Sequence, residues 1–371
     1  MSTIERVETA TAVLPLPAPL HLGAMTVTRR EYSAVRASDT DGISGVAYCL
    51  SREAPMAEIV ERLVAGHALG ADADDPSATW ERMLRGSAIV GRVGLVRRAI
   101  GLVDIALWDI AARRAGVPLW RMLGAGDAPR EAMLVAAYPS AERAPRDVAD
   151  EVLAQANGWS QVKISRMPDP AYMRELLALL GAELPASTGL VVDVGFGWRD
   201  ADEALAEIAQ WGDPRLAWLE DPLLPEDARG CARIRRESGL RLAVGDEVTD
   251  PAVLRALVEE GAVDVLRLDV VAIGGVTPAR ELVSWASDRG VPMSGHVYPE
   301  VTAHLGIGVE TFARGANPYD PAPSFIVGGP VFDGAVFEGA VFDGAVRPTD
   351  AAGSGFTLDP GVFTFAGKGR S

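Results

Sequence analysis

Polar residues that recur at the ends of apolar runs are the part of this sequence best suited to chemistry. Six of them follow one another at intervals of 30, 27, 26, 23 and 27 residues: Lys163, Asp193, Glu220, Asp246, Asp269 and His296. Each interval is close to one βα unit of a parallel barrel, and such barrels carry their active sites at the carboxyl ends of the strands. We therefore predict that the six side chains meet in one mouth.

Three of these residues form a candidate metal site. Asp193, Glu220 and Asp246 would end three consecutive strands, where their charges repel unless a cation lies between them. An all-oxygen ligand set suits Mg²⁺ better than zinc or copper. A single carboxylate here would more simply cap the next helix or pair with an arginine, but three on adjacent strands favour the metal. Glu247 would replace Asp246 if the strand register shifted by one.

The remaining polar residues are candidates for acid–base and binding roles. Asp269 would fix the tautomer of His296 and raise its basicity, which makes a general base. Lys163 would either bind a substrate carboxylate or act as a base with a lowered pKa. His21 lies in a proline-rich N-terminal segment, and its position alone makes it a candidate for substrate contact. His304 fits a structural role.

The elements that must position these residues alternate regularly from about residue 130 onward. Strands are expected at 160–164, 189–194, 216–220, 240–246, 263–269 and 291–296, with helices at 171–180, 200–211, 226–238 and from 251. Asp250-Pro251 and Thr277-Pro278 are typical N-cap and first-turn pairs. Six such units favour a closed (β/α) barrel over an open Rossmann-type sheet, since no G-x-G-x-x-G follows a strand.

The first part of the chain has a different pattern. Strand-like runs between 26 and 48 flank a turn at Asp39–Gly42, and 57–64 and 95–115 are helical, the latter ended by Gly116 and Pro118. We expect an α+β capping domain at 1–126, a barrel domain at 127–330 and a C-terminal segment at 331–371 that returns to the cap. Residues 331–346 nearly repeat Val-Phe-Asp/Glu-Gly-Ala, which we interpret as an extended loop or hairpin.

Composition limits the partners. Apolar residues make up 48% of the 371, enough for a large core, and the net charge of −16 argues against nucleic acid or an acidic membrane surface. Cys49 and Cys231 have no metal-binding spacing and are expected to be reduced thiols of a cytoplasmic protein. Prolines interrupt the one apolar N-terminal stretch, so a signal peptide or membrane span is not expected there.

Together these residues resemble the enolase superfamily, within it the mandelate racemase/muconate lactonizing enzyme group. The resemblance covers about residues 20–359 and is most specific at Ala99–Gly124, Trp218–Pro222, Ile273–Val276 and Gly290–Leu305. It implies a modified TIM barrel, (β/α)7β, with an N-terminal capping domain whose loops, here within 14–24 and near 51–54, close over the site. We expect a small carboxylate substrate and a homo-oligomer.

The resemblance also implies roles. Asp193, Glu220 and Asp246 correspond to Mg²⁺ ligands, Asp269 and His296 to a basic dyad, and Lys163 to the first lysine of a K-x-K motif. Glu310 is the candidate for the eighth-strand acid that contacts the substrate.

Two positions depart from the family pattern. Ser165 replaces the second lysine, with Arg166 beside it as another candidate for substrate binding, and Gly195 replaces a frequent asparagine. With one base missing, the leading hypothesis is Mg²⁺-dependent dehydration of a sugar acid. The alternatives are a racemase or epimerase that uses Arg166 or Lys163, and a Schiff-base aldolase with Lys163 as nucleophile.

Overall fold

Eight parallel strands form a nearly closed barrel in the computed structural model, which describes residues 1–22, 25–311, 324–329, 331–332 and 344–369. The strands are β4 (Arg130–Ala137), β5 (Gln161–Ser165), β6 (Gly189–Asp193), β7 (Leu216–Glu220), β8 (Leu242–Val244), β9 (Val265–Leu268), β10 (Met293–Gly295) and β11 (Val309–Thr311). Each pairs with the next from β4 to β10, and β11 pairs with β4. A bridge between Ser294 and Gly308 joins β10 to β11, so the expected (β/α)7β fold is confirmed.

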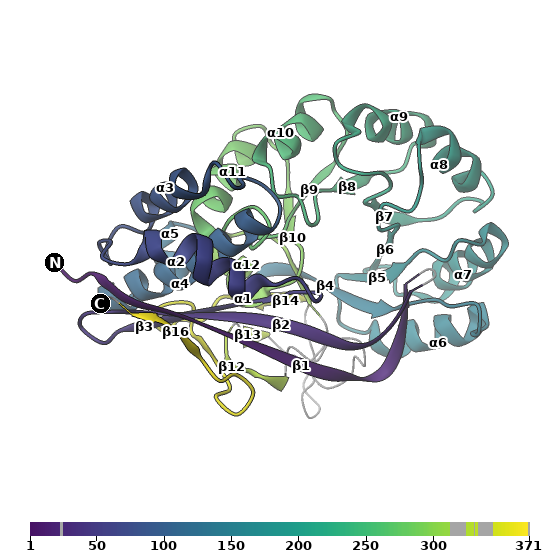
Figure 1. Ribbon diagram of the computed structural model, residues 1–371. Coiled ribbons are helices and arrows are strands. Elements are labelled where there is room, and N and C mark those ends of the chain that lie inside the picture. The colour runs from purple at the N-terminus through teal and green to yellow at the C-terminus, as the bar shows by residue number, and fades with distance from the viewer. Residues whose placement is uncertain (23–24, 312–323, 330, 333–343, 370–371) are drawn as a thin grey trace.

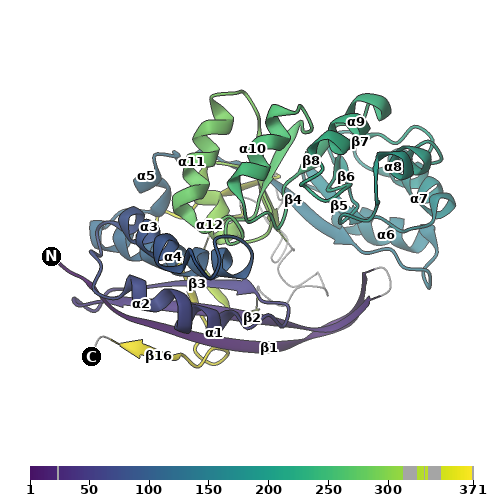
Figure 2. The same ribbon diagram turned by 45° about the horizontal axis from the view of Figure 1, so that its top comes forward.

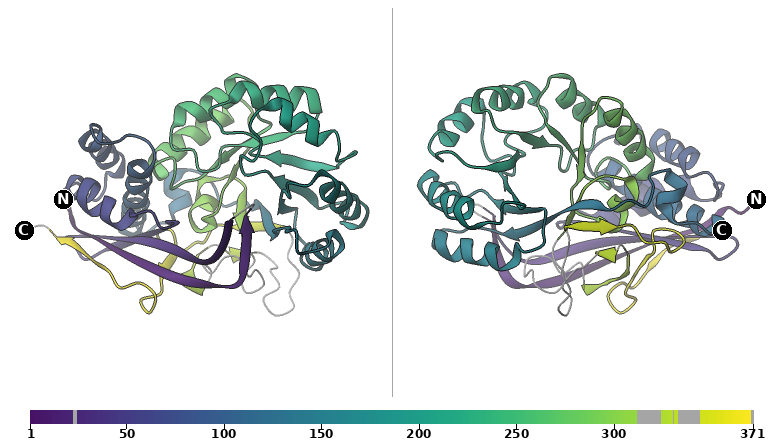
Figure 3. Two further views of the ribbon diagram at one scale, coloured as in Figure 1. Left: turned by 45° about the vertical axis from the view of Figure 1, so that its right-hand side comes forward. Right: turned by 180° about the vertical axis from the view of Figure 1, so that it is seen from behind.

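Helices cover the outside of the barrel (Figure 3). They are α6 (Pro145–Gln155), α7 (Pro170–Glu183), α8 (Ala201–Ile208), α9 (Ala228–Ser238), α10 (Pro251–Glu259), α11 (Val276–Ser287) and α12 (Pro299–Thr302), the last continued by the 3₁₀ turn η2 (Ala303–Leu305). Four of these helices begin at an aspartate whose carboxylate accepts a backbone N–H, namely Asp169, Asp200, Asp227 and Asp250. These caps satisfy donors that a helix cannot satisfy itself.

The barrel interior is built in layers. Met133, Val191, Trp218, Ala243 and Val265 pack together as an apolar floor. Because side chains alternate along a strand, the residues two positions further toward the carboxyl ends point into the same interior. These include Asp193, Glu220 and Arg267, so a charged layer lies directly above the apolar one.

A separate α+β unit packs against one side of the barrel (Figures 1 and 2). Its antiparallel sheet has the order β16-β1-β2-β3, with β1 (Ile4–Leu22), β2 (Met25–Asp39), β3 (Ser44–Leu50) and β16 (Ala366–Gly369). Its helices are α1 (Met56–Ile59), the π-helix η1 (Val60–Val64), α2 (Ala65–Ala68), α3 (Pro76–Ser87), α4 (Leu95–Ala115) and α5 (Leu119–Leu123). Helix α4 has the predicted bounds, is buried along most of its length and ends at Gly116 in the left-handed conformation. No helix in the described part of the chain is long and apolar enough to cross a membrane.

Helix α4 contacts the loop that follows β9. A Cβ on Gly101 would lie 2.4 Å from the carbonyl oxygen of Val271, so only glycine permits this approach. Asp104, three residues on, accepts hydrogen bonds from the N–H and the hydroxyl of Thr277, at 2.8 and 2.7 Å. The prediction that Thr277 caps α11 is therefore wrong, because Gly275 holds that position and Asp104 supplies the carboxylate.

The long hairpin of β1 and β2 extends from the capping sheet toward the barrel, as Figure 1 shows. Near its tip, Leu16 and Leu20 pack with Val27 and with Tyr138, which follows β4. The segment 14–24, predicted as a loop, consists largely of these two strands, and residues 23–24 lie outside the described residues.

The C-terminal segment contacts both units. β12 (Ile326–Gly328) pairs with β15 (Phe356–Leu358), while β14 (Ala345–Arg347) lies between β13 (Val331–Phe332) and the barrel strand β4. Most of the near-repeat at 331–346 lies outside the described residues, although its ends pair antiparallel in β13 and β14. The last strand, β16, pairs antiparallel with β1, so the N- and C-terminal ends lie side by side (Figure 1).

Candidate active site

The ammonium group of Lys163 lies among four carboxylates inside the barrel. Its Nζ is 2.5 Å from Glu220 Oε1, 2.8 Å from Glu310 Oε2, 3.1 Å from Asp193 Oδ2 and 3.9 Å from Asp246 Oδ2. Lys163 is only 4% exposed. The structure thus brings together Lys163 and the three acids predicted as metal ligands.

A second buried cation, Arg267 of β9, binds the same acids from another side. Its Nε lies 3.0 Å from Asp246 Oδ1 and 3.3 Å from Glu220 Oε2, and its Nη2 lies 2.5 Å from Glu310 Oε2. Arg267 was not among the site residues predicted from the sequence. A usable signal existed, because Arg267 interrupts an apolar strand two residues before Asp269 and therefore shares its face.

These charges govern the protonation of the site. Burial raises the pKa of Glu220, but Arg267 and Lys163 outweigh burial and lower it to about 2. Burial raises the pKa of Asp246 to about 7, although Arg267 opposes it. Burial would lower the pKa of Lys163, yet the surrounding carboxylates, Asp193 foremost, raise it well above its usual value.

The oxygen-only donor set fits a hard divalent cation. Oxygens of Glu220, Asp246 and Glu310 lie within 4.8 Å of one another, and Asp193 joins them through Lys163. Carboxylates at this separation match the ligand preference of Mg²⁺. Glu220, Asp246 and Asp193 could therefore hold the ion.

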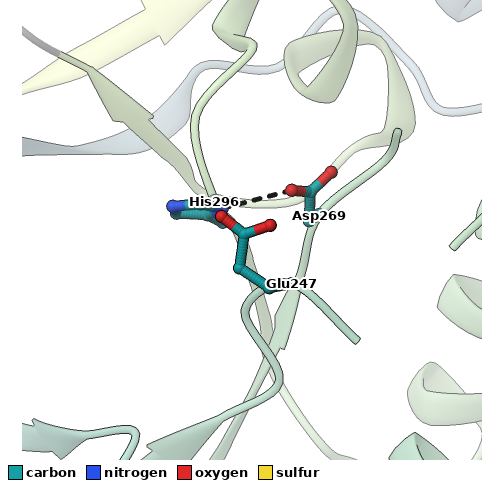
Figure 4. A group of neighbouring side chains, drawn as sticks. All are labelled: Glu247, Asp269 and His296. Atoms are coloured by element: carbon teal, nitrogen blue, oxygen red, sulfur yellow. Dashed lines mark hydrogen bonds and ion pairs between the residues drawn. The ribbon is translucent and has the colours of Figure 1, made fainter. Parts of the chain in front are cut away.

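Asp269 and His296 lie beside this group at the ends of neighbouring strands. His296 Nδ1 is 3.4 Å from Asp269 Oδ2, as the dashed line in Figure 4 marks, and Nε2 is 3.7 Å from Asp246 Oδ2. Asp269 Oδ1 also accepts the N–H groups of Val271 and Ala272, at 2.9 and 2.8 Å. Burial lowers the pKa of His296, but Asp246 and Asp269 outweigh it and raise the pKa to about 9. The imidazole is thus held with one nitrogen toward the carboxylate group.

Glu247, the alternative metal ligand, belongs to a different cluster. Its carboxylate lies near His296 and Asp269 (Figure 4), but it is paired with Arg52, at 2.5 Å, and with Arg98. Both arginines come from the capping unit, and Arg98 Nη1 also lies 3.7 Å from Asp269 Oδ2. Two cations already neutralise Glu247, which favours Asp246 as the ligand.

Two predicted substrate-binding residues lie on β5 or just after it. Ser165 lies opposite Asp193 in the strand register, at the barrel mouth. Arg166 is instead bound to Glu207, with its Nε 2.7 Å from Oε1, and its guanidinium stacks on the Trp198 ring. The structure therefore does not bring Arg166 to the carboxylate group, because Glu207 neutralises it on the outer side.

The other two predicted substrate contacts, Glu310 and His21, lie on β11 and β1. Glu310 lies on the eighth barrel strand, as predicted, but in register with Met133 of the apolar floor. It therefore lies deep in the barrel, where its Oε2 binds Lys163 and Arg267. The backbone of His21 lies at the end of β1, opposite Thr26, and its side chain lies outside the described residues.

Comparison with known proteins agrees with this geometry. Residues 5–124 match the family "Mandelate racemase / muconate lactonizing enzyme, N-terminal domain", and residues 147–362 match "Enolase C-terminal domain-like". The chain is 32% identical to the 3,6-anhydro-alpha-L-galactonate cycloisomerase of Streptomyces coelicolor, over 81% of this chain and 84% of the relative. It is 30% identical to the L-talarate/galactarate dehydratase of Salmonella typhimurium, over 81% and 78%.

A solved structure extends the match to nearly the whole chain. The crystal structure of a racemase from Streptomyces coelicolor with bound magnesium superposes with a TM-score of 0.85 at 27% identity, covering 97% of this chain and 100% of that one. The matches of both halves of the sequence thus point to one family. The fold of the barrel with its cap and the acidic site point to the same family. The chain is an enzyme of the enolase superfamily and belongs to its mandelate racemase/muconate lactonizing enzyme group.

Proposed function

We propose that this enzyme is a Mg²⁺-dependent dehydratase of a sugar acid, an aldonate or an aldarate. The position of His296 carries the proposal, since its Nε2 lies 3.7 Å from Asp246 Oδ2, at the edge of the carboxylate group. Bound Mg²⁺ would hold the substrate carboxylate and stabilise the charge that develops on it. The α-carbon of that substrate would then lie next to the imidazole, which is the geometry of α-proton abstraction.

The described residues offer one base rather than two. Ser165, which ends β5 at the barrel mouth, is too weak a base for an α-proton. Lys163 is held protonated by the carboxylates around it, and Arg166 is paired with Glu207. Racemisation needs a donor and an acceptor on opposite faces of the intermediate, whereas elimination can proceed on one. The single base therefore supports dehydration.

In the proposed reaction, His296 Nε2 takes the α-proton and the electrons of the C–H bond form the enediolate. The enediolate then expels the β-hydroxyl, which leaves as water with the proton returned by His296. The enol that remains tautomerises to a 2-keto-3-deoxy acid. Asp269 holds the imidazolium in place throughout, through the contact at Nδ1.

The names of the relatives support a sugar-acid enzyme and define the alternative reactions. A dehydratase and a cycloisomerase of sugar acids are about equally similar to this chain, and a racemase resembles it in structure. A racemase or epimerase is accordingly the second candidate function. The contacts of Lys163 argue against the Schiff-base aldolase, because an amine nucleophile must be neutral.

The proposal is tested with a library of aldonates and aldarates, plus 3,6-anhydro-galactonate and galactarolactone for the cycloisomerase reaction. With Mg²⁺ present, a 2-keto acid should accumulate and be captured as its semicarbazone. In D₂O, a substrate analogue without the β-hydroxyl should exchange its α-hydrogen in one configuration only. Exchange from both configurations at comparable rates would establish the racemase instead. Borohydride inactivation with substrate present, unaffected by EDTA, would point to the aldolase.

We also propose a cytoplasmic homo-oligomer. The free thiols of Cys49 and Cys231 support a reducing compartment. Between α3 and α4 the side chains of Ile89, Val90 and Val93 are strongly exposed, which supports burial against another copy. Light scattering should show an oligomer that a glutamate at Ile89 and Val90 weakens, while a glutamate at the exposed Leu224 leaves it intact.

A further inference from the structure

Arg267 is completely buried, and its donors are all directed within the barrel. Besides Glu220, Asp246 and Glu310, its Nη1 donates to Ser294 Oγ at 2.8 Å and to the carbonyl of Gly295 at 3.2 Å. Its exposed fraction is 0%. Since all of these partners belong to the barrel strands and their ends, Arg267 is suited to holding protein groups rather than substrate.

The contacts of Arg267 determine which oxygen of each acid is turned toward the centre. Glu220 Oε2 faces Arg267 and accepts the indole N–H of Trp218 at 3.0 Å, which leaves Oε1 toward Lys163. Asp246 Oδ1 accepts the Nε–H of Arg267 at 3.0 Å, and Oδ2, which lies 3.4 Å from Nη2 of the same guanidinium, also faces Lys163 and His296. The guanidinium therefore sets the direction of both carboxylates, with one oxygen of each turned toward Lys163.

The charges of this group also balance in a specific way. With Asp193, Glu220, Asp246 and Glu310 all ionised, four negative charges face two positive charges, those of Lys163 and Arg267. When His296, whose Nε2 lies 3.7 Å from Asp246 Oδ2, is neutral and can act as a base, the difference, −4 + 2, is −2, the charge that one divalent cation neutralises. Without Arg267 the remainder would be −3, and an uncompensated buried charge is strongly unfavourable.

We propose that Arg267 is a positioning residue of the metal site, which orients Glu220 and Asp246 and matches the group to one divalent cation. This inference rests on the proposed Mg²⁺ site. The role of Arg267 goes beyond the presence of that site, because two effects of the arginine on the affinity for the ion oppose each other. Coulomb repulsion alone would make removal of the arginine tighten Mg²⁺ binding, whereas its orienting role makes removal weaken binding.

The test is Mg²⁺ affinity measured by calorimetry on the full-length protein. Arg267→Met should bind Mg²⁺ at least about tenfold more weakly, as expected for loss of a group that orients metal ligands. Arg267→Lys, which keeps the charge but loses the planar fork, should recover part of that loss. Arg98→Met is the control, since it removes a cation from the Glu247 cluster and should leave Mg²⁺ affinity unchanged within about twofold.

Two further measurements keep the result interpretable. Ser294→Ala removes one acceptor of the guanidinium with little change in volume, and should weaken Mg²⁺ binding less than Arg267→Met does. Mn²⁺ bound in place of Mg²⁺ should show an altered electron paramagnetic resonance spectrum in folded Arg267 variants. The inference is overturned if folded Arg267→Met binds Mg²⁺ as tightly as the wild type or more tightly. If Arg267→Met does not fold, the same result in both Ser294→Ala and Arg267→Lys overturns it. Absence of Mg²⁺ binding by the wild type would instead overturn the proposed function.

Discussion

The backbone N–H of Leu50, at the end of the capping strand β3, donates a hydrogen bond of 3.1 Å to the hydroxyl of Tyr298, two residues after His296. Val297 and Tyr298 have φ angles of 45° and 49°, in the left-handed region that is unfavourable for a β-branched or bulky residue. Tyr48 reinforces the contact, because its ring packs edge-on against Tyr298 and its hydroxyl donates to Glu300 at 3.0 Å. The capping unit thus holds the segment that carries the base.

Tyr298→Phe should reduce turnover without changing Mg²⁺ affinity. The variant keeps the ring but loses the acceptor for Leu50, so the strained segment is held less firmly and His296 is less well positioned. We expect kcat to fall roughly tenfold, the size expected for about 1.4 kcal/mol. Steady-state kinetics with the identified substrate and calorimetry with Mg²⁺ check it. A full-rate enzyme would show that the hydrogen bond has no part in positioning the base.

Asp269→Asn should lower both the pKa of His296 and the rate. In the metal-free protein Asp246 and Asp269 raise the pKa of His296 to about 9 against the effect of burial. An amide in place of Asp269 loses part of that stabilisation and favours the wrong tautomer, so kcat should fall at least about 10³-fold. Nuclear magnetic resonance titration of the imidazole measures the first effect directly.

The sign of the His296 effect on stability can be checked in the same protein. Because the folded pKa is above 6.5, this group stabilises the metal-free fold below pH 6.5, and the contribution is lost as pH rises through about 9. Asp269→Asn should flatten the fall in the free energy of unfolding over that interval. An identical pH dependence in the two proteins would mean that Asp269 does not govern the histidine.

The choice between Asp246 and Glu247 can be decided by a matched pair of variants. Asp246→Asn should abolish calorimetric Mg²⁺ binding, as should alanine at Asp193 or Glu220, because each removes a charged ligand oxygen. Glu247→Gln should retain the binding, since Arg52 and Arg98 already neutralise Glu247. Loss of Mg²⁺ binding only in Glu247→Gln would reverse the assignment.

His304 should make the fold acid-sensitive. Its Nδ1 accepts the N–H of Trp120 and its Nε2 donates to the carbonyl of Ser354, both at 3.1 Å, which requires the neutral ring. Burial lowers its pKa from 6.5 to about 4. Below pH 6.5 His304 is therefore protonated in the unfolded chain but stays neutral in the folded protein. The free energy of unfolding falls by up to about 3 kcal/mol as pH drops to about 4.

His304→Gln provides the comparison, because an amide can accept and donate in similar directions without titrating. Urea unfolding at pH 7, 5.5 and 4.5 should show a smaller loss of stability in the variant than in the wild type. Parallel losses would assign the acid sensitivity to other groups.

The sequence was sufficient to predict the barrel and its rim because the regular spacing of polar strand ends follows directly from the βα repeat. The bounds of β7 and α4 were predicted without error. Pairing between distant segments was not predictable. Glu310 was identified, but its depth depends on β11 pairing with Ala132–Leu134 of β4, which local sequence does not specify. Likewise, the start of α11 depends on Asp104, 173 residues earlier.

Arg267 was missed for a related reason. A charged residue inside an apolar strand is costly by itself, and only the acids from three other strands make it favourable. The pairing of Arg166 with Glu207 could not be predicted either, because it joins the segment after β5 to helix α8, 41 residues further along the chain. Chemistry-bearing positions were thus easier to predict than the partners that neutralise them.

The pairing of β16 with β1 has a consequence for biosynthesis. Arg6 lies opposite Gly369, so the capping sheet lacks its outer strand until β16 has been synthesised. Contacts between residues this far apart in the chain form slowly, since a very long loop must close first. The barrel units can form in order during translation, while the edge of β1 stays exposed to pairing with other chains. A nascent chain that stalls before β16 is complete would therefore be prone to aggregate through β1.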